Sequence, residues 1–69
     1  MKRGKILEIQ PRGMSTVYNY ICIGDDNNFF SFAVEARYHS EIIEGIGNPI
    51  GSEIEYNDRT DQPIVRFLV

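Results

Sequence analysis

The feature that most constrains the fold is a pair of short aromatic segments separated by a polar turn. The segment 16–23 places its side chains alternately on two faces, as a β-strand does. One face holds Val17, Asn19, Ile21 and Ile23, and the other holds Tyr18, Tyr20 and Cys22. The aromatic segment 29–34 follows after the polar turn 24–28, whose residues tolerate positive φ. The two segments are expected to pair as a β-hairpin.

Both faces of the 16–23 strand are largely apolar, which leaves two interpretations open. Either the tyrosine face covers the core and is capped by the segment 35–48, or it is a binding surface. Tyrosine hydroxyls favour a half-wet position over deep burial. If the hairpin forms, Tyr18, Tyr20 and Phe29 can make one continuous aromatic patch on which unpaired nucleic-acid bases would stack.

Three more strands are expected, at 4–9, 52–56 and 64–69, with turns at 11–13 and 57–63. In the first of them, regular alternation would place Ile6 and Glu8 on one face. The segment 35–45 has weak helical spacing and is expected to form one or two helical turns or an irregular loop. Five short strands with a long third connection predict an all-β domain, a five-stranded OB-fold barrel, with an SH3-like barrel as the alternative.

The chain has 69 residues and is expected to form a single domain, 1–69, near the lower size limit for a self-sufficient core. Cys22 is the only cysteine and His39 the only histidine, so no disulfide, zinc site or nucleophilic dyad is expected. Cys22 itself is expected to be a packed thiol. We expect no enzyme activity, metal or cofactor. The basic start of the chain lacks the apolar run of a signal peptide and no segment approaches the length of a membrane span, which predicts a cytoplasmic protein.

The net charge is −3, from seven Lys and Arg against ten Asp and Glu. This balance argues against strong non-specific binding to nucleic acid, because contacts to phosphates dominate that affinity. The basic residues are, however, concentrated near the start of the chain: Lys2, Arg3, Lys5 and Arg12. This end is either a basic binding region or a solvated terminus without a partner.

Several short motifs follow one family pattern over nearly the whole chain. They are Gly4-Lys5-Ile6, Val17-Tyr18-Asn19-Tyr20-Ile21, Asn28-Phe29-Phe30-Ser31-Phe32, the strand 51–56, and Pro63-Ile64-Val65. In this order and spacing they resemble a divergent cold-shock domain. The resemblance implies an OB fold, with Lys5 as a phosphate contact and with base-stacking positions at Tyr18, Tyr20, Phe29 and Phe32.

Other positions depart from the family pattern. Glu8 stands where the family has a stacking tryptophan, Ser31 replaces a histidine, and Asn19 replaces a motif glycine. These departures predict weaker binding or a different ligand.

The sequence therefore supports two hypotheses of function. The first is binding of single-stranded RNA or DNA with low sequence specificity, as in a transcript chaperone or regulator, with Lys5 and Arg12 contacting phosphates and the aromatic residues stacking on bases. The second is a protein-interaction module or homodimer that uses the same apolar face.

Overall fold

Five strands and one helix make up the part of the chain that the computed structural model describes, residues 2–13, 16–57 and 65–68. In chain order they are β1 (Lys2–Pro11), β2 (Val17–Gly24), β3 (Phe29–Glu35), α1 (Ala36–Ile46), β4 (Glu53–Tyr56) and β5 (Val65–Phe67). The prediction of a mostly β domain with a long connection between the third and fourth strands is confirmed. The turn expected at 57–63 lies almost entirely outside the described residues, as do Pro63 and Ile64 of the last motif.

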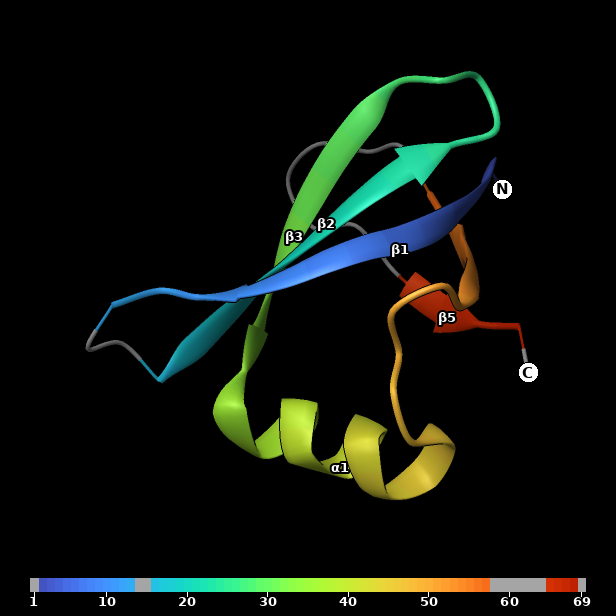
Figure 1. Ribbon diagram of the computed structural model, residues 1–69. Coiled ribbons are helices and arrows are strands. Elements are labelled where there is room, and N and C mark those ends of the chain that lie inside the picture. The colour runs from blue at the N-terminus through green and yellow to red at the C-terminus, as the bar shows by residue number, and fades with distance from the viewer. Residues whose placement is uncertain (1, 14–15, 58–64, 69) are drawn as a thin grey trace.

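The strands form one antiparallel sheet in the order β3-β2-β1-β4-β5. The long strand β1 is central, because residues 2–5 pair with β4 while residues 4–11 pair with β2. The sheet curls into a half-barrel, with α1 lying across one end of it (Figure 1). This architecture is compatible with a small β-barrel.

A β-bulge in β1 changes which of its side chains face the core. Ile6 is opposite Cys22, but the next pair is Glu8 with Ile21, so β1 has one extra residue between them, at Leu7. Alternation therefore does not continue through the strand as the sequence predicted. Glu8 lies on the face opposite Ile6, which is completely buried.

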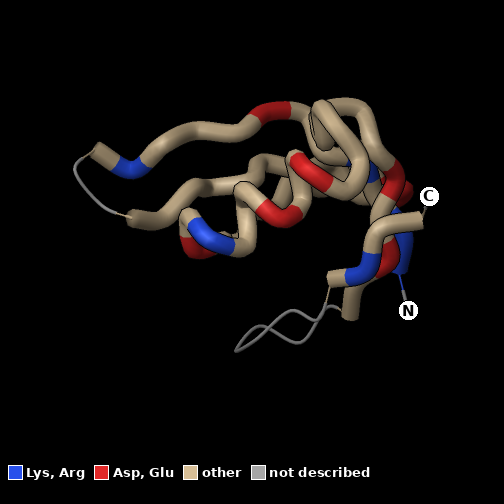
Figure 2. Tube along the Cα trace, turned by 90° about the horizontal axis from the view of Figure 1, so that it is seen from below, with Lys and Arg blue, Asp and Glu red and all other residues tan. Residues whose placement is uncertain are grey.

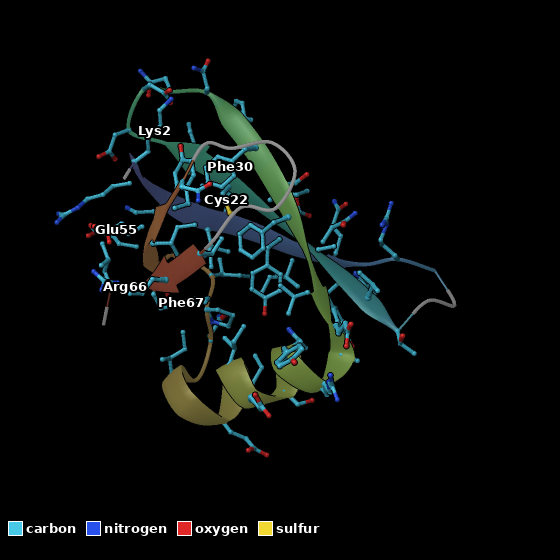
Figure 3. All side chains as sticks on the ribbon, turned by 180° about the vertical axis from the view of Figure 1, so that it is seen from behind. Lys2, Cys22, Phe30, Glu55, Arg66 and Phe67 are labelled. Carbon is cyan, nitrogen blue, oxygen red and sulfur yellow. The ribbon has the colours of Figure 1, made fainter. Side chains whose placement is uncertain are left out.

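The core lies on the inner, concave face of the sheet. Its buried residues are Ile6, Tyr20, Cys22, Ile54 and Tyr56, with partly buried apolar side chains packed around them. Cys22 and Phe30 point toward the side on which β4 and β5 lie (Figure 3). The buried Cys22 thiol donates a weak hydrogen bond to the Tyr20 carbonyl oxygen at 3.8 Å, which confirms the prediction of a packed thiol.

Helix α1 is longer than the sequence predicted, with 11 residues. Its half-buried side chains, Ala36, His39, Ile42 and Ile46, recur every three or four residues and so form one stripe. The helix packs on β2 and β3. It ends at Gly47, where the φ of 79° favours glycine and the backbone N–H donates to the Ile43 carbonyl oxygen at 2.9 Å.

Two glycines allow β1 and β2 to approach closely beneath a pair of aromatic rings. Gly4 is opposite Gly24, and the rings of Phe30 and Tyr56 lie over this end of the sheet with centroids 4.1 Å apart. A Cβ atom on Gly4 would lie 2.7 Å from the Ile23 carbonyl oxygen and 3.3 Å from the Phe30 ring. The close approach of β1 and β2 and the position of the Phe30 ring therefore require a residue without a side chain at Gly4.

Burial of two titratable groups makes stability fall at alkaline pH. Burial raises the pKa of the Cys22 thiol to about 12, and burial, followed by the nearby Tyr18, raises the pKa of the Tyr20 hydroxyl. Above the ordinary thiol pKa of 9.0 the unfolded chain releases a proton that the folded chain keeps. The contribution of the protonated Cys22 thiol to the free energy of unfolding is therefore fully present below that pH and is lost as the pH rises toward about 12.

We expect the urea midpoint of the wild type to fall between about pH 8 and about pH 11, and to fall less in Cys22→Ser, which has no thiol to titrate. The decline that remains in the variant belongs to Tyr20. Parallel declines in the two proteins would contradict the role of Cys22.

Candidate nucleic-acid interface

Three of the predicted stacking residues lie on the inner face of the sheet. Tyr20 has 0% of its surface exposed, and its hydroxyl shares a hydrogen bond with His39 Nδ1 at 2.7 Å. Tyr18 is half-buried and stacks on the His39 ring, with centroids 4.0 Å apart. Phe32 is half-buried against Tyr20, at 5.3 Å between centroids. The structure thus matches the interpretation in which the tyrosine face covers the core and the following segment caps it.

His39 is a structural contact that the sequence analysis missed. From the sequence we considered it only as a possible metal-binding or catalytic group, yet it joins α1 to both tyrosines of β2. The signal that could have found it is its position in the helical stripe, three residues before Ile42.

The hairpin register separates Phe29 from the tyrosines, so the expectation of one patch containing Tyr18, Tyr20 and Phe29 is wrong. Phe29 is opposite Ile23, whereas Tyr20 is opposite Phe32. Directly opposed residues of an antiparallel pair share a face, and neighbouring residues of one strand do not. Phe29 therefore lies on the outer face, where 70% of its surface is exposed.

We call the convex surface of β1, β2 and β3 the outer face. Its side chains are Lys5, Glu8 and Gln10 from β1, Asn19, Ile21 and Ile23 from β2, and Phe29, Ser31 and Ala33 from β3. Leu7, at the bulge, is also exposed. Phe29 is the most exposed of the large apolar residues described, and such exposure beside further apolar side chains is typical of an interaction surface.

One row of side chains crosses the outer face from β3 to β4. Phe29 is opposite Ile23, Ile23 is opposite Lys5, and Lys5 is opposite Glu53. Neighbouring strands are about 5 Å apart, so the aromatic ring and the ammonium group originate roughly 10 Å from one another. The row brings together two of the predicted site residues, Phe29 and Lys5.

Arg12, the remaining predicted site residue, lies far from this row. It is exposed just after β1, and its backbone N–H donates to the Val17 carbonyl oxygen at 3.2 Å. Seven residues of extended chain separate it from Lys5, or roughly 23 Å. Arg12 is therefore at the opposite end of β1 from the row.

Charges of both signs gather near the two chain ends (Figure 2). Arg66 donates to the Glu55 carboxylate at 2.9 Å, and Lys2 lies 3.6 Å from Asp26. Figure 3 shows the Arg66 and Glu55 side chains close together. Hydrogen bonds from Asn28, backbone first, lower the pKa of Asp26, and Lys2 adds to this effect. Arg3 is also exposed at this end of β1.

A polar groove of about 440 Å³ lies beside the row. It is formed by the start of β1, the end of β2, the β2–β3 turn and the start of β4, and is lined by Arg3, Gly4, Lys5, Ile23, Gly24, Asp25, Asn27 and Glu53. Because Ile23, Lys5 and Glu53 belong both to the row and to the groove lining, the groove and the exposed Phe29 ring are adjacent parts of one surface.

No protein family, curated protein or solved structure matches this chain. Within the described ranges, no helix has the length and apolar character needed to cross a membrane. The same residues contain no group of three His, Cys, Asp or Glu side chains arranged to hold a metal ion.

Proposed function

We propose that this domain is an OB-type barrel that binds single-stranded nucleic acid on its outer face. The observation that carries the proposal is the row in which an exposed aromatic ring, Phe29, lies two strands away from an exposed cation, Lys5. Binding involves no covalent step. It requires only stacking of the Phe29 ring on a base and attraction of a phosphate by Lys5.

The strand order supports the OB assignment. A five-stranded OB barrel is a meander of three strands followed by two more, with a longer connection after the third. Here β1, β2 and β3 form the meander, α1 fills the connection, and β4 returns to pair with β1. The cold-shock resemblance of the sequence points the same way.

The outer face supplies both contributions that a single strand needs. A phenylalanine ring stacks on any base, which gives affinity with little sequence preference. Arg3 and Lys5 are two residues apart in β1 and so lie on the same face, where they can contact successive phosphates of a strand. Of the positions that the cold-shock resemblance implies, Phe29 and Lys5 fit this face, whereas Tyr20 has no surface to offer a base.

A Phe29→Ala variant should lose about 5- to 100-fold in affinity for a fluorescein-labelled single-stranded oligomer, as expected for one stacked base. Fluorescence anisotropy at low salt measures this loss. Stability should not change, because the ring is 70% exposed. Tyr38→Ala is the matched control: Tyr38 is an exposed aromatic residue, at 48%, but lies on α1. Equal affinities of the wild type and both variants would contradict the proposal.

A second candidate function is a protein-interaction module or homodimer. The observation in its favour is that β3 ends the strand order, so its outer edge pairs with no other described strand. Such an edge can pair with a strand of another chain. The net charge of −3 agrees with this candidate better than with nucleic acid.

Sedimentation velocity over a wide concentration range separates the two candidates. The nucleic-acid proposal predicts a monomer that binds oligomers with a strong salt dependence. Concentration-dependent association without oligomer binding would instead support the second candidate.

A further inference from the structure

Four charged side chains, two cationic and two anionic, line the groove beside Phe29 without forming ion pairs with one another. Arg3, Lys5, Asp25 and Glu53 all line it, yet none of them makes an ion pair with another described side chain. Among the described residues near this end, Lys2 pairs with Asp26 and Arg66 pairs with Glu55. The groove thus offers cationic donors and anionic acceptors together, without satisfying either internally.

We propose that this groove binds a ribose-phosphate unit and makes the domain prefer RNA over DNA, an inference that rests on the proposed function. Arg3 and Lys5 contact the phosphate, and one of the two carboxylates, Asp25 or Glu53, accepts the hydrogen bond that the ribose 2′-hydroxyl donates. The 2′-hydroxyl is the group that distinguishes RNA from DNA at such a site.

Carboxylates in a nucleotide site can distinguish RNA from DNA. A carboxylate repels a phosphate, so Asp25 and Glu53 weaken binding of any strand that offers them no donor. A hydroxyl that donates to a carboxylate makes a short, charge-assisted hydrogen bond and offsets that repulsion. DNA keeps the phosphate contacts with Arg3 and Lys5 but lacks the hydroxyl, so nothing offsets its repulsion by the carboxylates.

The position of the groove suits a nucleotide next to a stacked base. Ile23 lines the groove and is opposite Phe29, while Glu53 is opposite Lys5. A base on the Phe29 ring is therefore close enough for its sugar and phosphate to enter the groove, whose four charges lie on β1, β4 and the β2–β3 turn.

Matched uridine oligomers test this inference, because uracil has no exocyclic amino group that could donate to the carboxylates in place of the sugar. We compare oligo(rU), oligo(dU) and 2′-O-methyl oligo(U) by fluorescence anisotropy. Wild-type protein should bind oligo(rU) about fivefold more tightly than oligo(dU), the change expected for one net hydrogen bond. The 2′-O-methyl oligomer, which cannot donate, should behave as DNA does.

The double variant Asp25→Ala/Glu53→Ala should bring the rU-to-dU affinity ratio close to one, chiefly by strengthening DNA binding. Glu41→Ala/Glu44→Ala, which removes two exposed carboxylates from α1, is the control for net charge. It should leave the ratio unchanged. A wild-type ratio of one, or equal gains for both oligomers in the groove variant, would overturn the RNA preference while leaving nucleic-acid binding intact. Absence of binding to any oligomer would overturn the proposed function itself.

Discussion

Replacing Tyr20 with alanine should cost about 3–5 kcal/mol of unfolding free energy, as for other large buried aromatic side chains. A domain of 69 residues has a total stability of only about 3–10 kcal/mol, so much of the variant should be unfolded at room temperature. The cost has two sources. The Tyr20 ring is completely buried against Phe32, and its hydroxyl is bonded to His39 on α1.

Tyr20→Phe separates these two sources. It keeps the ring in the core and removes only the hydroxyl, so we expect a loss of about 1 kcal/mol. Urea unfolding followed by circular dichroism measures both variants. Had Tyr20 been a surface platform for bases, alanine would leave stability unchanged and abolish oligomer binding, and that combination would contradict the buried position.

Gly4→Ala is expected to destabilise the domain by about 1–3 kcal/mol, the usual cost of overpacking, and Gly4→Val by more. The new Cβ would meet the Ile23 carbonyl oxygen at 2.7 Å and the Gly24 Cα at 3.3 Å. Backbone atoms of β2 cannot rotate away as a side chain can. The two strands must therefore separate at this point, beneath the Phe30 and Tyr56 rings.

Gly45→Ala is the control for the glycine substitution. A Cβ at Gly45 has no neighbour within 4 Å, and the residue lies inside α1. Alanine there should stabilise the domain by about 0.5–1 kcal/mol, because glycine is a poor helix former. Urea unfolding measures both changes in the free energy of unfolding. A loss for Gly4→Ala together with a gain for Gly45→Ala would verify the close approach of β1 and β2. A Gly4→Ala variant as stable as the wild type would contradict it.

The sequence predicted the strands well because each has clear alternation and is bounded by turn residues. It did not predict which face of β2 is buried, since tyrosines on one side and isoleucines on the other are both apolar. The face on which Phe29 lies depends on the length of the hairpin loop. Five residues between Ile23 and Phe29 place these two opposite each other, and that pairing assigns Phe29 to the isoleucine face.

Two other features were beyond the sequence patterns. The bulge at Leu7 moves Glu8 onto the outer face. No glycine or proline at this position indicates a bulge in the sequence. The helix has 11 residues although only weak spacing indicated it. Its contacts with β2 include His39, a polar residue that a search for apolar periodicity does not count.

These corrections move the candidate interface to the other side of the sheet. The family resemblance indicated Tyr18, Tyr20 and Phe32 as stacking positions, and all three lie on the inner face of the sheet. Phe29 and Lys5 remain, now joined through Ile23 in one row that borders a polar groove. The proposed interface therefore has fewer aromatic rings than the sequence suggested, which predicts modest affinity.

Isoleucine methyl groups test the location of the interface most directly, because the chain has matched reporters on both sides of the sheet. Ile21 and Ile23 lie on the outer face, and Ile6 and Ile54 are buried on the inner face. In methyl NMR spectra recorded during titration with oligo(rU), the signals of Ile21 and Ile23 should shift with increasing oligomer while those of Ile6 and Ile54 stay in place. Shifts confined to Ile43, exposed on α1, or no shifts at all, would contradict binding at the outer face.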